Sequence, residues 1–134
     1  MREIKFRGKC VYSADWVYGS LITNIPELAP TIVTSENSVV GYINTEYTVD
    51  PETVGEYTGL KDKDGTKIYE GDIVVLDNET AWVTFDDGCF CVLGYLGDGR
   101  TYPIRSSMFL GKEIKVIGNI HENPELLEVQ HDSN

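Results

Sequence analysis

The sequence predicts an all-β protein made of many short strands, arranged as a barrel or roll with a second β subdomain. Strand-like runs of apolar and aromatic residues recur at short intervals. No segment keeps the 3.6-residue apolar period of an amphipathic helix. Glycine and aspartate stand between the runs, where glycine supplies the positive φ that tight turns require. Together these features are typical of a small all-β fold.

The first part of the chain, residues 1–54, reads as an N-terminal β subdomain. Residues 2–7 alternate between apolar and charged side chains, which predicts a half-buried strand, and Gly8 permits a bend or bulge after it. Residues 9–12 and 16–22 predict a hairpin. Shorter β runs follow at 31–34 and 39–43, and residues 44–54 read as polar connection with one helical turn after Asp50 and Pro51.

Residues 55–128 read as a second β unit that opens with the most informative stretch of the chain, residues 55–76. Two turns, Asp64-Gly65 and Glu70-Gly71-Asp72, separate three strands there. Further strands are expected at residues 81–85, 89–93, 101–104 and 113–120. Asn123 and Pro124 predict the start of a short C-terminal helix, and residues 129–134 are expected to be a frayed acidic tail.

Charge and hydropathy narrow the classes of function. The chain has 11 Lys and Arg against 22 Asp and Glu, a net charge of −11. Repulsion from phosphate disfavours direct nucleic-acid binding and anionic membranes. No run approaches the roughly 20 apolar residues of a membrane span, and no signal-peptide core follows the N-terminus, so a cytoplasmic location is expected.

Cysteine and acidic residues are the candidates for a metal site, and in both cases a structural role is favoured. Cys89 and Cys91 share one strand face, but a zinc site would need the distant Cys10, His121 or His131 as further ligands. We therefore expect reduced cysteines and no metal or cofactor.

The sequence Asp62-Lys63-Asp64-Gly65 resembles a calcium loop superficially. Counting from Asp62, the sixth and twelfth positions are Lys67 and Ile73, where an EF-hand has glycine and glutamate. A hairpin turn is therefore favoured. A hydrolase would need a cluster of acidic residues, and the candidates are Glu70, Asp72, Asp86 and Asp87. Each of them lies at a predicted turn, where aspartate and glycine are favoured for backbone reasons, so the turn explanation is preferred. We predict no catalytic residues.

The central stretch resembles the signature of the YopX family, small proteins of bacteriophages and prophages of Gram-positive bacteria. The similar residues are Tyr57-Thr58-Gly59-Leu60-Lys61-Asp62-Lys63-Asp64-Gly65 and Ile68-Tyr69-Glu70-Gly71-Asp72-Ile73-Val74. The opening from Met1 to Gly8, the phrase from Trp16 to Leu21 and the ending from Val116 to Leu127 are similar as well. The resemblance implies an SH3-like barrel or roll and a bacterial cytoplasm. It implies no reaction and no catalytic residues.

The resulting hypothesis is a non-enzymatic phage accessory protein that binds protein partners, including copies of itself as a homo-oligomer. Four tyrosines in or near the variable loops are candidate contact residues, with closing the core as the alternative: Tyr42, Tyr47, Tyr95 and Tyr102. A second hypothesis is nucleic-acid related, either as an acidic mimic of DNA or through a basic face of Lys5, Arg7 and Lys9. A metal-dependent hydrolase is the third.

Overall fold

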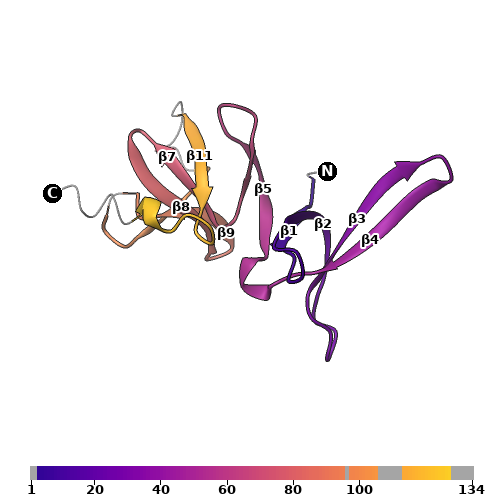
Figure 1. The fold of residues 1–134 in the computed structure, drawn as a ribbon. Coiled ribbons are helices and arrows are strands. Elements are labelled where there is room, and N and C mark those ends of the chain that lie inside the picture. The colour runs from indigo at the N-terminus through magenta and orange to yellow at the C-terminus, as the bar shows by residue number, and fades with distance from the viewer. Residues whose placement is uncertain (1–2, 96, 106–112, 128–134) are drawn as a thin grey trace. The chain divides into compact units, whose positions relative to one another are not determined.

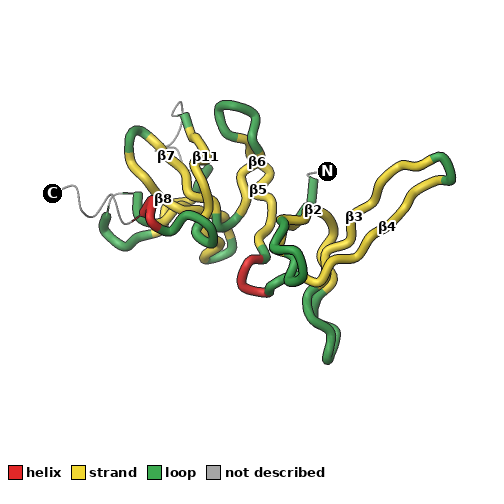
Figure 2. Tube along the Cα trace, in the orientation of Figure 1, coloured by secondary structure: helices red, strands yellow, loops and turns green. Residues whose placement is uncertain are grey.

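The computed structural model describes residues 3–95, 97–105 and 113–127. Most of these residues are in antiparallel strands, so the all-β prediction is confirmed (Figures 1 and 2). The chain forms two compact units, Met1–Tyr57 and Thr58–Asn134, here called unit 1 and unit 2. The division lies inside a strand, between Tyr57 and Thr58, where the sequence suggested residues 54 and 55. The expected tail at 129–134 lies outside the described residues.

Unit 1 is a twisted antiparallel sheet. Its elements are β1 (Phe6–Lys9), β2 (Trp16–Ile22), β3 (Thr31–Ser38), β4 (Gly41–Thr48), the 3₁₀ turn η1 (Pro51–Thr53) and the start of β5 (Gly55–Lys61), with strand order β4-β3-β2-β1-β5. A hairpin that ends in β2 is present as predicted, but its first strand is Phe6–Lys9, where residues 9–12 were expected. The predicted turn after Asp50 is confirmed, since its carboxylate accepts the Glu52 N–H at 3.0 Å.

Two glycines let the strands of unit 1 approach closely. A Cβ on Gly8 would lie 2.9 Å from the Val49 Cβ, and a Cβ on Gly19 would lie 2.1 Å from the Val33 carbonyl oxygen. The register of β1 and β2 runs unbroken through Gly8, so the pair has no β-bulge there, although the sequence permitted a bend or bulge. Gly8 is instead required because Val49 occupies the space where a side chain would stand.

The largest difference from the sequence prediction is the hairpin of β3 and β4. The runs 31–34 and 39–43 were expected as separate short strands, with polar connection from residue 44. The chain instead forms two continuous strands that turn at Val39 and Val40. Polar residues such as Ser35, Glu36 and Asn44 are tolerated within them because this part of the hairpin is exposed.

Unit 2 contains the rest of β5, β6 (Lys67–Tyr69) and a five-stranded sheet. The sheet has the order β10-β9-β8-β7-β11 and comprises β7 (Asp72–Leu76), β8 (Glu79–Asp86), β9 (Cys89–Leu93), β10 (Thr101–Pro103) and β11 (Ile114–Asn119). Its end strands β10 and β11 pair with β9 and β7 and not with each other. The described strands therefore form no closed barrel, and this part of the SH3-like prediction is not met. A single short helix covers 125–127, as expected after Asn123 and Pro124.

The core of unit 2 is apolar and continuous. Strands β6 to β9 and the residues after them contribute its buried side chains, which are Ile68, Val74, Leu76, Ala81, Val83, Val92, Tyr95 and Ile104. Val74 and Leu76 on β7, Ala81 and Val83 on β8 and Val92 on β9 lie on one face of the sheet. Ile73 and Cys91 on the opposite face are buried as well.

Candidate functional site

The outer part of the β3–β4 hairpin, residues 34–45, is here called the arm. Strand β2 pairs with β3 only as far as Val33, through the pairs Ser20–Val33, Leu21–Ile32 and Ile22–Thr31. From Thr34 to Thr45 the hairpin has two strands and no third neighbour among the described elements (Figure 1). An isolated two-stranded hairpin is only marginally stable in water.

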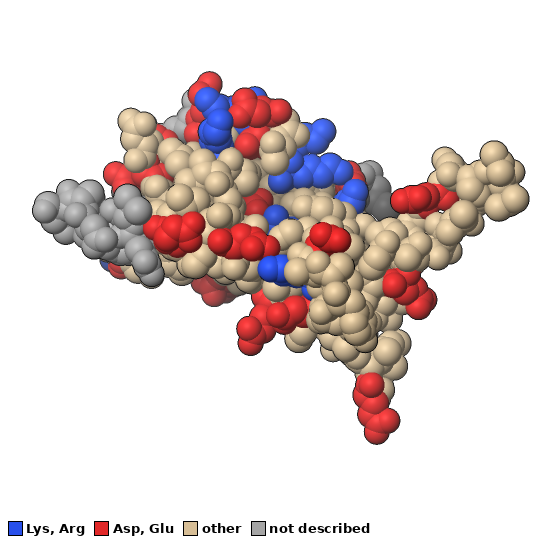
Figure 3. Space-filling view, viewed as in Figure 1, with Lys and Arg blue, Asp and Glu red and all other residues tan. Residues whose placement is uncertain are grey.

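The end of the arm is apolar and open to solvent. Val39 and Val40 expose 105% and 84% of their reference area, and Tyr42 exposes 75%. Ile43 is also exposed. In Figure 3 the far end of the arm, at the right of the view, is free of Lys and Arg. Scattered exposed apolar residues are normal, but a group at the end of a projecting hairpin is typical of a contact surface.

The turn at the end of the arm is held by Ser38. Its hydroxyl donates to the Gly41 carbonyl at 2.8 Å and accepts the Val40 N–H at 3.2 Å. Gly41 has a φ of +114°, which a residue with a side chain rarely adopts. The turn was not predicted because the two β-branched valines at its centre are typical of a strand. Ser38 and Gly41 were the available signal.

The four tyrosines predicted as contact residues have different positions. Tyr42 lies in the arm and Tyr47 is half-buried on the same strand. Tyr95 is only 3% exposed and belongs to the core of unit 2. It therefore closes the core, which was the alternative to partner contact. Tyr102 is half-buried and stacks edge-on against Tyr95, with ring centroids 6.2 Å apart.

The hydroxyl of Tyr102 donates to the Asp98 carboxylate. This hydrogen bond raises the pKa of Tyr102 and, together with the Arg100 backbone N–H, lowers the pKa of Asp98. The contact closes the loop before β10. Tyr102 therefore has an intramolecular partner, and of the four tyrosines only Tyr42 lies in the arm.

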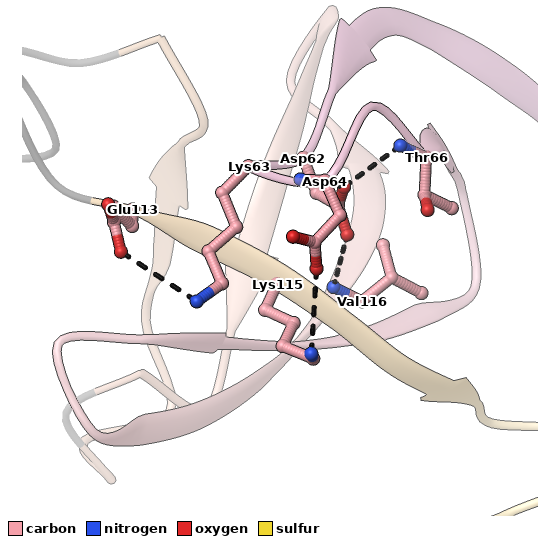
Figure 4. A network of polar contacts seen from close by, with 7 residues as sticks. All are labelled: Asp62, Lys63, Asp64, Thr66, Glu113, Lys115 and Val116. Atoms are coloured by element: carbon pink, nitrogen blue, oxygen red, sulfur yellow. Dashed lines mark hydrogen bonds and ion pairs between the residues drawn. The ribbon is translucent and has the colours of Figure 1, made fainter.

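The sequence that superficially resembles a calcium loop, residues 62–65, forms a turn in which the Asp62 carboxylate accepts backbone N–H groups (Figure 4). One oxygen of Asp62 accepts the N–H groups of Asp64 and Thr66, both at 2.9 Å, and the other accepts the Val116 N–H at 3.0 Å. Backbone N–H groups therefore take three of the roughly four acceptor positions of the carboxylate. Asp62 therefore connects the β5–β6 turn to β11.

The charge state of Asp62 follows from the same contacts. Burial by itself raises the pKa of the carboxyl, but the three N–H donors, led by Val116, together with Lys115 hold it below its ordinary value. Two surface ion pairs flank the site, Lys115 with Asp64 at 3.5 Å and Lys63 with Glu113 at 3.9 Å. These exposed pairs add little stability.

The remaining acidic residues also serve turns. Asp72 is buried and accepts the Tyr69 N–H at 2.8 Å, and Asp86 accepts the Thr101 hydroxyl at 3.1 Å. Asp87 has a positive φ of 51° in the turn before Gly88. Within residues 3–95, 97–105 and 113–127, no three His, Cys, Asp or Glu side chains are grouped so that they could hold a metal ion.

Cys89 and Cys91 lie on one face of β9, as predicted, with their Sγ atoms 3.4 Å apart. Burial and the neighbouring Cys89 raise the pKa of Cys91 to about 11. At neutral pH this thiol is therefore protonated and a poor nucleophile. Cys10 is buried in unit 1.

The basic face expected from Lys5, Arg7 and Lys9 is reduced by burial of its central member. The Arg7 side chain is buried with its guanidinium over the Trp16 ring, 5.0 Å from the centroid. A cation–π contact of this kind stabilises the β1–β2 hairpin. Arg7 is thus occupied within unit 1.

Comparison with known proteins places the chain in a family. The family model described as YopX protein matches residues 5–128. The chain belongs to the YopX family. This match confirms the resemblance noted in the sequence. No curated protein matches the chain.

A solved structure is similar over nearly the full length of this YopX-family chain. The crystal structure of protein EF1440 from Enterococcus faecalis is 26% identical, with a TM-score of 0.65, and the match covers 95% of this chain and 99% of that one. Among the residues that the structure describes, no helix is long and apolar enough to cross a membrane.

Proposed function

We propose that this YopX-family protein is a non-enzymatic accessory protein of a phage or prophage, and that it binds other proteins through the arm. The observation that carries the proposal is the exposure of Val39, Val40 and Tyr42 at the end of a two-stranded hairpin. Fully burying a valine or isoleucine side chain contributes roughly 1.5–3 kcal/mol. A partner that covers the arm therefore gains most from its apolar end.

Contact with a partner would also stabilise the arm itself. Its two strands have no third strand beside them, and such hairpins are marginal in water. A partner that packs against the arm would supply the burial that this hairpin lacks in the free protein. The exposed apolar residues are thus consistent with a binding role, since solvation alone gives no reason for them.

Affinity purification from a lysogenic bacterial host tests this proposal. We expect the wild-type chain to retain a partner that is lost when Val39 and Val40 are both replaced by serine. Tyr12→Ser is the matched control, because Tyr12 is 86% exposed in unit 1 outside the arm. Equal capture by all three proteins would contradict the proposal.

The same variant separates this function from the DNA-mimic alternative. Serine in place of Val39 and Val40 leaves the net charge of −11 unchanged. A mimic of DNA binds through its acidic side chains, so its partner would be retained by the double serine variant. Loss of the partner therefore favours the apolar arm.

A further inference from the structure

We propose that a second copy of the same chain binds the arm by pairing with the outer edge of β4, antiparallel and centred on Asn44. This inference rests on the proposed function, because it names one partner of the same arm. Strand β4 is last in the strand order of unit 1, and no described strand lies on its outer side. An edge of this kind is a template for a further strand.

The edge of β4 lacks the features that usually prevent such pairing. Proteins protect edge strands with lysine, proline or a bulge. Residues 41–48 contain no Lys, Arg or Pro, and Glu46 is their single charge. The register with β3 is unbroken, so no bulge turns the edge aside.

The direction of the main-chain groups identifies which residues can pair. The Val49 N–H donates to the Pro30 carbonyl at 3.0 Å, toward β3. Because main-chain groups alternate in direction along an antiparallel strand, the even-numbered residues of β4 direct theirs away from β3. These outward residues are Tyr42, Asn44 and Glu46.

One end of the edge is already occupied. The Thr48 carbonyl, which also faces outward, accepts the Val11 N–H at 3.0 Å. The open edge therefore runs from Tyr42 to Glu46. Asn44 stands at its centre, so a two-fold axis there pairs every outward residue of one copy with an outward residue of the other.

Electrostatics favours the same register. With the axis at Asn44, Glu46 lies opposite Tyr42 of the second copy, and the two Glu46 residues are separated by about 14 Å along the strands. With the axis at Thr45 this separation along the strands falls to about 7 Å, half as much, so the two carboxylates repel each other more strongly. The register about Asn44 therefore keeps the two Glu46 carboxylates farther apart.

Light scattering coupled to size-exclusion chromatography, with sedimentation equilibrium, tests the pairing on the full chain. We expect a dimer whose dissociation constant decreases between 0.15 and 0.5 M salt, since salt screens the repulsion of two acidic copies. Asn44→Lys and Asn44→Asp each place like charges opposite one another, and each should weaken the dimer by about tenfold or more. An equimolar mixture of the two variants should restore it.

The matched pair Thr45→Lys and Thr45→Asp controls for register and for folding. These substitutions add the same charges one residue away, and their mixture should show no comparable restoration. A wild-type chain that is monomeric at high concentration would overturn the proposal, as would restoration by the Thr45 pair alone. Circular dichroism establishes that each variant is folded.

Failure of the self-pairing proposal can be distinguished from failure of the proposed function. A monomeric chain that still loses a host partner on replacement of Val39 and Val40 would refute self-pairing and leave the arm as a contact surface. If host capture does not depend on the two valines but the dimer is still weakened by substitution of Asn44, the proposed function is refuted and self-pairing is retained.

Discussion

The two units use their apolar residues in opposite ways. Unit 2 buries a continuous cluster that includes Ile68, Val74 and Val92. Unit 1 buries few apolar side chains, among them Ile32 and Val49. Nearly all exposed large hydrophobic residues of the described chain lie in unit 1; those found in unit 2 are Phe85 and Ile117.

This contrast indicates where each unit obtains its stability. Unit 2 resembles an ordinary small domain that is stabilised by burial of its own side chains. Unit 1 depends on strand pairing and close backbone approach, such as that of Gly8 to Val49, and leaves apolar surface uncovered. We therefore expect unit 2 to be the more stable part of the molecule.

Each unit has its own fluorescent reporter, because Trp16 lies in unit 1 and Trp82 in unit 2. Replacing either tryptophan by phenylalanine leaves the other to follow the unfolding of its own unit. Urea unfolding in these two backgrounds measures the stability of each unit separately.

The largest effect is expected in the core of unit 2. Leu76 is fully buried, and Leu76→Ala should reduce the free energy of unfolding reported by Trp82 by about 3 kcal/mol through lost burial and a cavity. Ile43→Ala in the exposed arm is the comparison and should change the Trp16 transition by less than about 1 kcal/mol. Equal losses would show that the contrast between the units is wrong.

A smaller loss is expected when strand pairing in unit 1 is disturbed. Gly19→Ala places a Cβ 2.1 Å from the Val33 carbonyl oxygen, so β2 and β3 must separate. We expect a loss of roughly 2–3 kcal/mol in the Trp16 transition. Ser20→Ala, on the same strand but exposed, should cost less than about 0.5 kcal/mol. A Gly19→Ala protein as stable as the wild type would refute the close approach.

The Asp62 contacts should contribute about 2 kcal/mol to unit 2. Asp62→Asn weakens hydrogen bonds to a charged acceptor and turns an amide N–H toward backbone N–H groups. Asp64→Asn removes an exposed ion pair to Lys115 and should cost about 0.5 kcal/mol or less. The Trp82 transition measures both variants, and a larger loss for Asp64→Asn would contradict our interpretation.

The pH dependence of this difference has a defined sign. The folded pKa of Asp62 is lowered, so its stabilisation is present above the unfolded pKa of about 3.9 and is lost as pH falls through the folded value. The stability gap between wild type and Asp62→Asn should therefore narrow below about pH 4. A gap that stays constant at lower pH would mean that the carboxylate charge is not responsible.

The sequence predicted local features better than long-range ones. Turns such as Asp64-Gly65 and Asp87-Gly88 were identified because glycine and aspartate favour them through local backbone geometry. The contact of Asp62 with Val116 joins residues far apart in the chain, and no local pattern reports it. The closed barrel was predicted but is not formed by the described strands. Barrel closure depends on pairing between end strands that are far apart in the sequence, and no local pattern reports this pairing either.

The arm was missed for a different reason. A strand that is buried on one face alternates between apolar and polar residues, and this alternation was the signal used for strands. The arm is exposed on both faces, so polar residues such as Ser35 and Glu36 interrupt the pattern without breaking the strand. Hydrophobic periodicity is therefore a poor guide to a strand that is exposed on both faces.

The smallest effect on stability is expected at the end of the arm. Replacing Val39 and Val40 by serine should change the Trp16 transition by no more than about 0.5 kcal/mol, because exposed side chains lose few contacts on truncation. The same change should reduce partner binding, since the apolar area available for burial is smaller. A loss of stability above about 1 kcal/mol in the monomer would mean that the valines already pack against the chain itself. Loss of binding with unchanged stability is the result expected of residues that serve contact with another protein.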